Sequence, residues 1–325
     1  MPPYYGLATS EKRPPMVDYH GDSITFCLCV LANQRAGVMQ VSNMMPTKKL
    51  RQCARLLDLC HCRTAANVMY RLYHESVLVP LRHLDFKVIQ PNIFLRSKWI
   101  WTMWWQGEAE APQLVRANFE RLRQVFGEEN VVIVDKMTLS EWLMIDERVF
   151  ARMARGQLSI THLSDIVRMK LVATYGGLWI DATVAVSPAI LNVVDEQKSF
   201  ITLSSTLDDN RFVSKKSWTS WFIGGPAGHP LFQNVGAVLE SVAVSGAAWP
   251  DYYLLDDLCR VFFDQNPWFE KELIQVKKDW MYEAFLTSSS GNMVDMLACW
   301  QTNTRWSIQK MTYKRPSQIA QRLSE

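Results

Sequence analysis

The segment SDIVRMKLVATYGGLWIDATV, residues 164–184, contains the change from helix to strand around which the rest of the chain is arranged. We expect a helix that is capped by Ser164 and ends at Gly176 and Gly177, because glycine tolerates the left-handed conformation of a helix end. The apolar residues that follow predict a short buried strand with Asp181 at its carboxyl end. Ligands of open parallel sheets bind beyond such strand ends, so this carboxylate is predicted to line a binding site.

Alternating strand and helix patterns lie on both sides of this segment. Before it, the pattern predicts strands over 98–105 and 130–135 and helices over 111–127 and about 138–153. After it, we expect strands over 199–204 and 218–223, and helices over 230–244, 252–263 and 280–300. Strands that alternate with helices are typical of an α/β domain whose central sheet is mainly parallel.

The N-terminal third is basic and has a helical pattern. In residues 47–77, apolar residues recur at three- and four-residue steps with Lys and Arg between them, which predicts a helical region. Residues 1–100 contain 13 basic and 6 acidic residues, whereas the whole 325-residue chain has a net charge of only +3. Such a region favours an anionic partner, such as lipid head groups or phosphorylated substrates, although an ordinary solvated helix face has the same composition.

Cysteine usage and hydropathy indicate the compartment. The seven cysteines include no Cys-x-x-Cys pair, and Cys60-His61-Cys62 is too tight for an ordinary zinc half-site, so we expect a reducing compartment. The N-terminus shows no pattern of a secretory signal. The longest early apolar run, 24–31, is much shorter than the ~20 residues of a membrane-spanning helix. A cytoplasmic protein is predicted, with peripheral contact at the inner membrane face as an option.

Two pairs of polar residues in the segment 164–184 are candidates for chemistry. Asp165 and Arg168 share a helix face, where they would bind a ligand or form an ion pair worth roughly a few tenths of a kcal/mol. A carboxylate at Asp181 needs a positive partner, and a divalent metal ion that holds a diphosphate is one such partner. An Asx-turn at the end of the strand is the alternative. Thr183, two residues further along the strand, is expected to point the same way as Asp181, with its hydroxyl placed to bind a water of the metal or a phosphate oxygen.

The motif Ser164-Asp165-x-x-Arg168, followed by YGGLWIDATV at 175–184, resembles the core of sugar-nucleotide glycosyltransferases. It is most similar to the capsular polysaccharide synthesis group, which is related to glycosyltransferase family 32 and to sugar-transferring bacterial toxins. Further segments resemble the family in the same order: WWQG at 104–107 with Ala-Pro at 111–112, FIGGPAGHP at 222–230, DYYLLD at 251–256 and KMTYK at 310–314. The resemblance covers residues from about 95 to 315.

The resemblance implies a GT-A type fold over 95–325, preceded by a largely helical basic region over 1–94. It implies a hexosyltransferase-like enzyme that moves a sugar from a nucleotide-sugar to a polysaccharide or glycoconjugate, which includes a lipid-linked glycan, with retention of anomeric configuration. Asp181 matches the first carboxylate of the Asp-x-Asp motif that holds a divalent metal, so Mn²⁺ or Mg²⁺ is expected there.

The resemblance also assigns roles to residues of this chain. The implied catalytic residues are Asp181, Arg168 and Asp256. A tryptophan of the first strand, Trp101 or Trp104, would stack on the nucleobase, because a flat ring offers its face to any base. The implied donor-binding residues are Trp101, Trp104, Gln106, Asp165, Arg168, Gly177, Thr183 and Lys310.

One departure from the family pattern concerns the metal. Thr183 stands where the second carboxylate of the Asp-x-Asp motif would be, which weakens direct metal binding. A metal would then be held mainly by Asp181 and the diphosphate, or a carboxylate of the pair 256–257 would complete the site. Lys310 and Lys314 would close over the diphosphate as point charges, or they are ordinary surface lysines.

Two other functions stay open on the sequence. A toxin-like transferase that glycosylates a protein would use the same donor site. A catalytically inactive scaffold that binds sugar-nucleotides is the other, and Thr183 favours it. The basic N-terminal region is predicted to contact an anionic membrane or to pack on protein. Nucleic-acid binding is not expected, because the charge excess is modest and lacks interleaved exposed aromatic residues.

Overall fold

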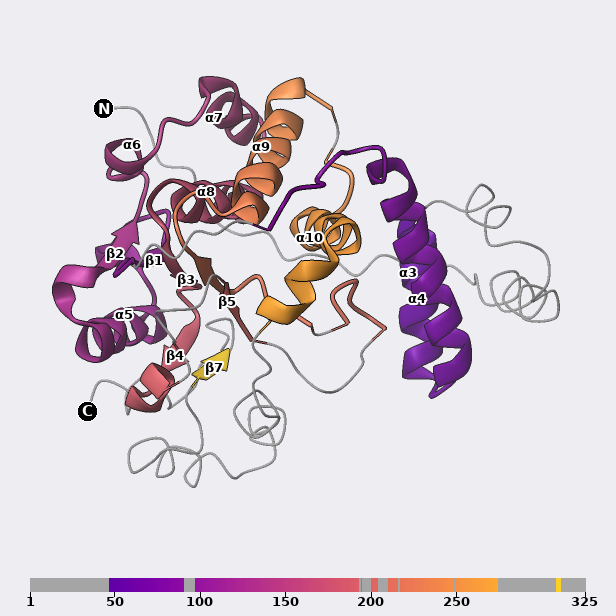
Figure 1. Ribbon diagram of the computed structural model, residues 1–325, viewed down its shortest axis with the longest axis horizontal. Coiled ribbons are helices and arrows are strands. Elements are labelled where there is room, and N and C mark those ends of the chain that lie inside the picture. The colour runs from indigo at the N-terminus through magenta and orange to yellow at the C-terminus, as the bar shows by residue number, and fades with distance from the viewer. Residues whose placement is uncertain are drawn as a thin grey trace, which may run out of the picture. The chain divides into compact units, whose positions relative to one another are not determined.

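The structure is a computed structural model of the chain, in which residues 47–90, 97–192, 194, 200–203, 210–215, 217–247, 249–273 and 308–310 are described (Figure 1). The chain divides into two compact units, Met1–Ser76 and Val77–Glu325. Among the described residues, none of the helices combines the length and the apolar character needed to cross a membrane. The helix expected over 280–300 lies outside the described residues.

The first unit contains a helical hairpin, made of α3 (Thr47–Leu59) and most of α4 (Arg63–Leu78). The hydroxyl of Ser76 donates to the hydroxyl of Thr47 over 3.3 Å, which joins the end of the second helix to the start of the first. The helical pattern over 47–77 is therefore confirmed, but as two helices. His61 separates them because its φ of 59° lies in the left-handed region, which does not continue a right-handed helix.

Within the described residues, the second unit is built on a five-stranded sheet with the order β2-β1-β3-β6-β5. Strand β1 pairs in parallel with both β2 and β3, whereas β6 is antiparallel to both of its neighbours. Four of the five strands therefore run in the same direction, and the predicted mainly parallel α/β sheet is confirmed. The strands are β1 (Ile100–Met103), β2 (Val131–Val134), β3 (Gly177–Ile180), β5 (Ile201–Thr202) and β6 (Phe222–Gly225).

The helices of this unit cover the sheet on two sides. Figure 1 shows α8 and α9 on one side and α5 on the other, and α8 packs against α9 as well as against β1 and β3. The helix expected over 138–153 is interrupted, because the Asp146 carboxylate caps a new helix by accepting from the Arg148 amide over 2.9 Å. The α-helices are α5 (Gln113–Phe126), α6 (Leu139–Trp142), α7 (Glu147–Ala154), α8 (Ile160–Tyr175), α9 (Pro230–Ser245) and α10 (Leu254–Gln265). Short 3-10 turns lie at Val79–Leu81, Glu108–Glu110, Glu128–Asn130, Pro188–Asn192 and Pro267–Glu272.

The sheet separates two apolar cores. Side chains of successive strand residues point to opposite faces, so Trp101 and Trp179 join the core on the side of α8 and α9. Their neighbours Ile100 and Leu178 join the other core, which includes side chains of α5. Because both faces are covered, the strands are apolar throughout rather than alternating with polar residues.

Helix α8 begins earlier than the sequence predicts. Its first residue is Ile160, and the cap is Ser159, whose hydroxyl accepts from the amide of His162 over 3.2 Å. The prediction that Ser164 caps the helix is wrong, because the serine five residues earlier makes that contact first. Asp165 consequently lies inside the helix and is only 7% exposed, where it needs a partner within the protein.

The glycine pair at the end of α8 has two different roles. Gly176 ends the helix with a φ of 67°, and its amide donates to the carbonyl of Val172 over 2.9 Å. A Cβ at Gly177 would lie 2.3 Å from the carbonyl oxygen of Trp99, so the backbone leading into β1 fills the space that a side chain would need. Close packing against β1 accounts for this glycine, and the donor contact expected of Gly177 stays a prediction.

A second, two-stranded sheet brings a distant segment to the end of β3. Strand β4 (Val184–Val186) pairs antiparallel with β7 (Ile308–Lys310), with Val184 opposite Lys310 (Figure 1). No local pattern in the sequence indicates this pairing. It places Lys310 opposite a residue that follows Asp181 by only three positions.

Candidate functional site

Asp181 follows β3 directly, at the carboxyl end of the strand as the sequence predicts. Its amide donates to the carbonyl of Trp221 over 3.0 Å, and its carbonyl accepts from the amide of Val184 over 2.8 Å. The side-chain amide of Asn118 on α5 donates to the carbonyl of Ala182 over 2.9 Å. These bonds fix a tight turn between β3 and β4 and hold Asp181 at the edge where the parallel strands end.

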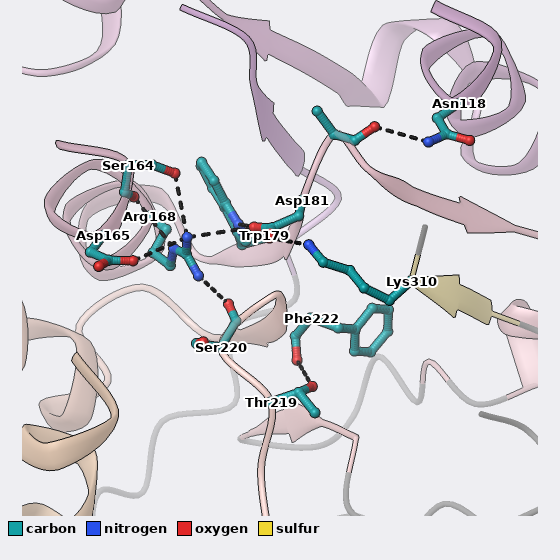
Figure 2. Close-up of polar contacts among 11 residues, drawn as sticks. Asn118, Ser164, Asp165, Arg168, Trp179, Asp181, Thr219, Ser220, Phe222 and Lys310 are labelled. Atoms are coloured by element: carbon teal, nitrogen blue, oxygen red, sulfur yellow. Dashed lines mark hydrogen bonds and ion pairs between the residues drawn. The ribbon is translucent and has the colours of Figure 1, made fainter. Parts of the chain in front are cut away.

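Both carboxylate oxygens of Asp181 are occupied by protein donors. Lys310 Nζ lies 2.5 Å from Oδ2, Trp179 Nε1 donates to Oδ1 over 2.8 Å, and Arg168 Nη2 lies 3.5 Å from Oδ1 (Figure 2). Burial alone would raise the pKa of Asp181, but the charges of Lys310 and Arg168 outweigh it and leave the pKa below its usual value. Asp181 is therefore an ionised carboxylate between two cations.

Arg168 connects three parts of the fold. Its Nη1 donates to the carbonyl of Ser220 over 2.6 Å, and its Nη2 lies 3.1 Å from Asp165 Oδ1 as well as near Asp181. The guanidinium also lies over the ring of Trp179, 5.1 Å from its centre. Only 5% of Arg168 is exposed, so its main effect is to orient the two carboxylates, as Figure 2 shows.

Two further carboxyl groups share this electrostatic environment. Burial raises the pKa of Asp165 to about 7; Arg168 opposes this shift, while Asp256 and Asp181 add to it. Burial also raises the pKa of Asp256 to about 6, against the lowering effects of the Trp218 indole, which donates to it over 3.1 Å, and of Arg168. The structure thus brings Asp256, at the start of α10, into the same charged cluster as Asp165, Arg168 and Asp181.

The two tryptophans expected to stack on a base differ in position. Trp101 is fully buried, its Nε1 donates to the carbonyl of Gly176 over 2.8 Å, and its ring packs edge-on against Trp142. A ring without exposed surface has no face for a base, so the prediction for Trp101 is wrong and its role is core packing. Trp104 is half-buried just after β1, and Gln106 is exposed in the turn that follows, at the sheet edge where Asp181 lies.

Thr183 is half-buried in the turn between β3 and β4. The expectation that it points the same way as Asp181 assumed a continuing strand and is wrong, because β3 ends at Ile180. The donor contact of Thr183 stays a prediction, and Lys314 lies outside the described residues.

Sequence reasoning missed three residues that hold the site together. Trp179 precedes Asp181 by two positions, and the period of two in a strand could have found it. The carbonyl of Ser220 accepts from Arg168, and the indole of Trp218 donates to Asp256. Both residues lie in the segment that leads into β6, and this segment is brought to the site because Phe222 of β6 pairs with Ile180 of β3. Contacts of this kind leave no local signal in the sequence.

A divalent metal does not fit this arrangement as it stands. Among the residues that the structure describes, no three His, Cys, Asp or Glu side chains form a group able to hold a metal ion. The carboxylate predicted to bind the metal, Asp181, already has the Lys310 ammonium against one oxygen and an indole N–H on the other. A metal ion on that oxygen would lie beside the Lys310 ammonium, and the repulsion between the two cations disfavours it.

Comparison with known proteins places this site within one family. The sequence profile of the capsular polysaccharide synthesis protein family matches residues 81–324, which include Asp165, Arg168, Asp181, Asp256 and Lys310. Neither a curated protein nor a solved structure shows significant similarity to the chain. Because the matched region spans most of the chain and the whole charged cluster, the protein belongs to the family of capsular polysaccharide synthesis proteins.

Proposed function

We propose that the protein is a glycosyltransferase that moves a sugar from a nucleotide-sugar to a glycan or lipid-linked glycan acceptor. One observation carries this proposal: an ionised carboxylate, Asp181, lies at the carboxyl ends of parallel strands with Lys310 and Arg168 against it. Ligands bind at that edge in open α/β sheets, and a diphosphate needs positive charge there. The family match supports the same role, because it covers every residue of the cluster.

In this proposal each side chain of the site has its own role in sugar transfer. The bond between the sugar and the diphosphate breaks, a bond from the sugar to an acceptor hydroxyl forms, and negative charge develops on the departing diphosphate. The Lys310 ammonium would stabilise that charge, and it is partly open to ligand with 26% of its side chain exposed. Arg168 would position Asp165 and Asp181, and Trp104 would stack on the base. Retention of configuration, implied by the family resemblance, is part of the proposal.

Proton transfer would fall to Asp256. Its pKa of about 6 lies near neutral pH, where a carboxylate can accept the proton of the attacking hydroxyl, and it is less buried than Asp165. We assign no covalent nucleophile.

The test is a screen of nucleotide-sugars for release of free nucleoside diphosphate by the purified protein, with transfer followed by mass spectrometry. Asp181→Asn removes the charge without changing the size, and we expect activity to fall about 100-fold or more while the fold persists. Asp146→Asn is the matched control, because Asp146 only caps α7 and pairs with Arg148. Near wild-type activity of Asp181→Asn in a folded protein would refute the assignment.

A binding protein without catalytic activity is the second candidate. The ion pair that the Asp181 carboxylate already forms with Lys310, together with Thr183 at the position of the second carboxylate, favours it. Calorimetry and product analysis on the same samples distinguish the two. Nucleotide binding without turnover of any sugar donor supports the binding protein, and turnover rejects it.

The basic N-terminal hairpin is proposed to contact an anionic membrane, where lipid-linked acceptors are found. On α3, Lys48, Lys49 and Arg55 are exposed beside Leu56 and Leu59, whose exposed fractions are 53% and 76%. Exposed leucines beside exposed cations are typical of helices that lie on a membrane surface.

A further inference from the structure

We propose that Lys310 takes the place of a divalent metal at Asp181, so that the protein binds the diphosphate of its donor through the Lys310 ammonium and without a metal ion. This inference rests on the proposed glycosyltransferase function and specifies how the donor is held. It departs from the expectation that Asp181 carries Mn²⁺ or Mg²⁺.

Both carboxylate oxygens of Asp181 already have positively charged or N–H partners from the protein. Lys310 Nζ is 2.5 Å from Oδ2, while Oδ1 accepts from Trp179 Nε1 and lies 3.5 Å from Arg168 Nη2. A divalent ion on the same oxygens would lie next to the Lys310 ammonium and the Arg168 guanidinium, with only the Asp181 carboxylate to offset the three cations. The repulsion between the ion and the two side chains would disfavour metal binding. Thr183 supplies no carboxylate to offset it.

The fold holds Lys310 in this position. Strand β7 pairs with β4 in a register that sets Lys310 opposite Val184 and Ile308 opposite Val186. Ile308 is fully buried and belongs to the same core as Val184 and Val186, so it anchors the strand. The ammonium also lies 5.9 Å from the centre of the Trp221 ring. Lys310 therefore reaches Asp181 from a paired strand.

The pair formed by Lys310 and Asp181 is open to a ligand. The side chains of Lys310 and Asp181 are 26% and 24% exposed, in contrast to Arg168, whose side chain is 6% exposed. An ammonium has three N–H donors, so Lys310 can keep its bond to Asp181 and still donate to a phosphate oxygen. Figure 2 shows its side chain extending from β7 toward the end of β3. Arg168 cannot serve in the same way, because its guanidinium is enclosed by protein.

Isothermal calorimetry with UDP, GDP, ADP and CDP tests this inference on the full chain, with EDTA in one series and MnCl₂ in the other. We expect at least one of these nucleotides to bind with affinities that agree within about twofold between the two series. Lys310→Met should weaken binding in EDTA by about 10- to 100-fold, because it removes a charged hydrogen bond to phosphate. Lys310→Arg keeps the charge and should retain most of the affinity.

The matched control is Lys170→Met. Lys170 also pairs with a carboxylate, Glu240, over 2.6 Å, but it joins α8 to α9 and lies outside the charged cluster. Its removal should leave nucleotide binding unchanged. Circular dichroism of each variant confirms that it is folded; if Lys310→Met fails to fold, the comparison of the EDTA and MnCl₂ series on the wild-type protein still decides.

Each outcome has one meaning. Wild-type binding that requires MnCl₂ overturns the inference but leaves the glycosyltransferase proposal intact. Equal binding by Lys310→Met and the wild type overturns the role of the ammonium. If no nucleoside diphosphate binds in either series, the proposed function itself fails and the inference fails with it.

Discussion

Lys310 Nζ lies 2.5 Å from Asp181 Oδ2, although 129 residues separate the two positions in the chain. The contact depends on the antiparallel pairing of β4 with β7, which places Lys310 opposite Val184. An aspartate that the sequence marks as a metal ligand is thereby matched by a positive charge of the protein itself.

Removal of Arg168 should strongly destabilise the protein. Arg168→Met leaves Asp165 and Asp181 without a shared cation and the carbonyl of Ser220 without its 2.6 Å bond. Breaking a buried ion pair from one side costs about 3–5 kcal/mol, so the urea midpoint should fall accordingly. Arg148→Met, which breaks an exposed pair with Asp146, is the control and should change the midpoint little. Equal losses in the two variants would contradict the role given to Arg168.

Asp165 should make the stability depend on pH. Its pKa is raised from 3.8 to about 7 by burial, so the folded state holds a proton that the unfolded state releases above pH 4. The contribution of Asp165 to stability is therefore present at low pH and is lost as the pH rises toward 7. Asp165→Asn mimics the protonated form and should flatten this decline between about pH 4 and about pH 7, as measured by urea unfolding. Parallel curves for variant and wild type would show that Asp165 is ionised throughout.

Gly177→Ala should be much more harmful than the same change at Gly156. Both glycines have positive φ, 104° and 69°, but a Cβ at Gly177 would lie 2.3 Å from the Trp99 carbonyl oxygen, whereas nothing lies within 4 Å at Gly156. We expect about 1 kcal/mol of backbone strain at Gly156 and at least ~2 kcal/mol more at Gly177, where β1 must move. Thermal unfolding of the two variants measures the difference, and similar melting temperatures would disprove the close packing of Gly177 against β1.

Substitution of Trp101 should affect stability, whereas substitution of Trp104 should affect nucleotide binding. Trp101→Ala removes a fully buried ring and should cost about 3–5 kcal/mol of folding free energy. Trp104→Ala, at a half-buried ring, should leave the protein folded but weaken nucleotide binding by ~1–3 kcal/mol, the usual worth of one stacked base. Calorimetry and urea unfolding on both variants check this division. Unaltered nucleotide affinity in Trp104→Ala would remove Trp104 from the donor site.

The basic hairpin should bind anionic vesicles. Sedimentation with phosphatidylglycerol vesicles, but not with phosphatidylcholine vesicles, should carry the protein into the pellet. The double variant Lys48→Glu and Lys49→Glu should reduce this binding about 10-fold or more, since each exposed lysine near such a surface contributes ~1 kcal/mol. Lys136→Glu with Lys271→Glu makes the same charge change at exposed positions elsewhere and should have little effect. Equal losses of vesicle binding in both double variants would show that binding depends on the net charge of the protein and not on the hairpin.

Local patterns were sufficient for part of the site. The strand that ends at Asp181 was predictable because an apolar run follows a glycine helix stop, and the placement of Asp165 and Arg168 on one face followed from helical spacing. The N-cap of α8 is Ser159 and not the expected Ser164, because a serine at either position fits the local pattern of a helix start.

By itself, the sequence determined the alternation of strands and helices, the membership in a family and the position of Asp181 at a strand end, because these depend on neighbouring residues. Only the tertiary structure decided that Lys310 faces Asp181, that Asp256 joins the cluster and that Trp101 is buried while Trp104 is not. Pairing between distant strands and the choice of sheet face set these contacts. Many residues along the chain fit the same local pattern as these contact partners, so only the packed fold determines which of them meet.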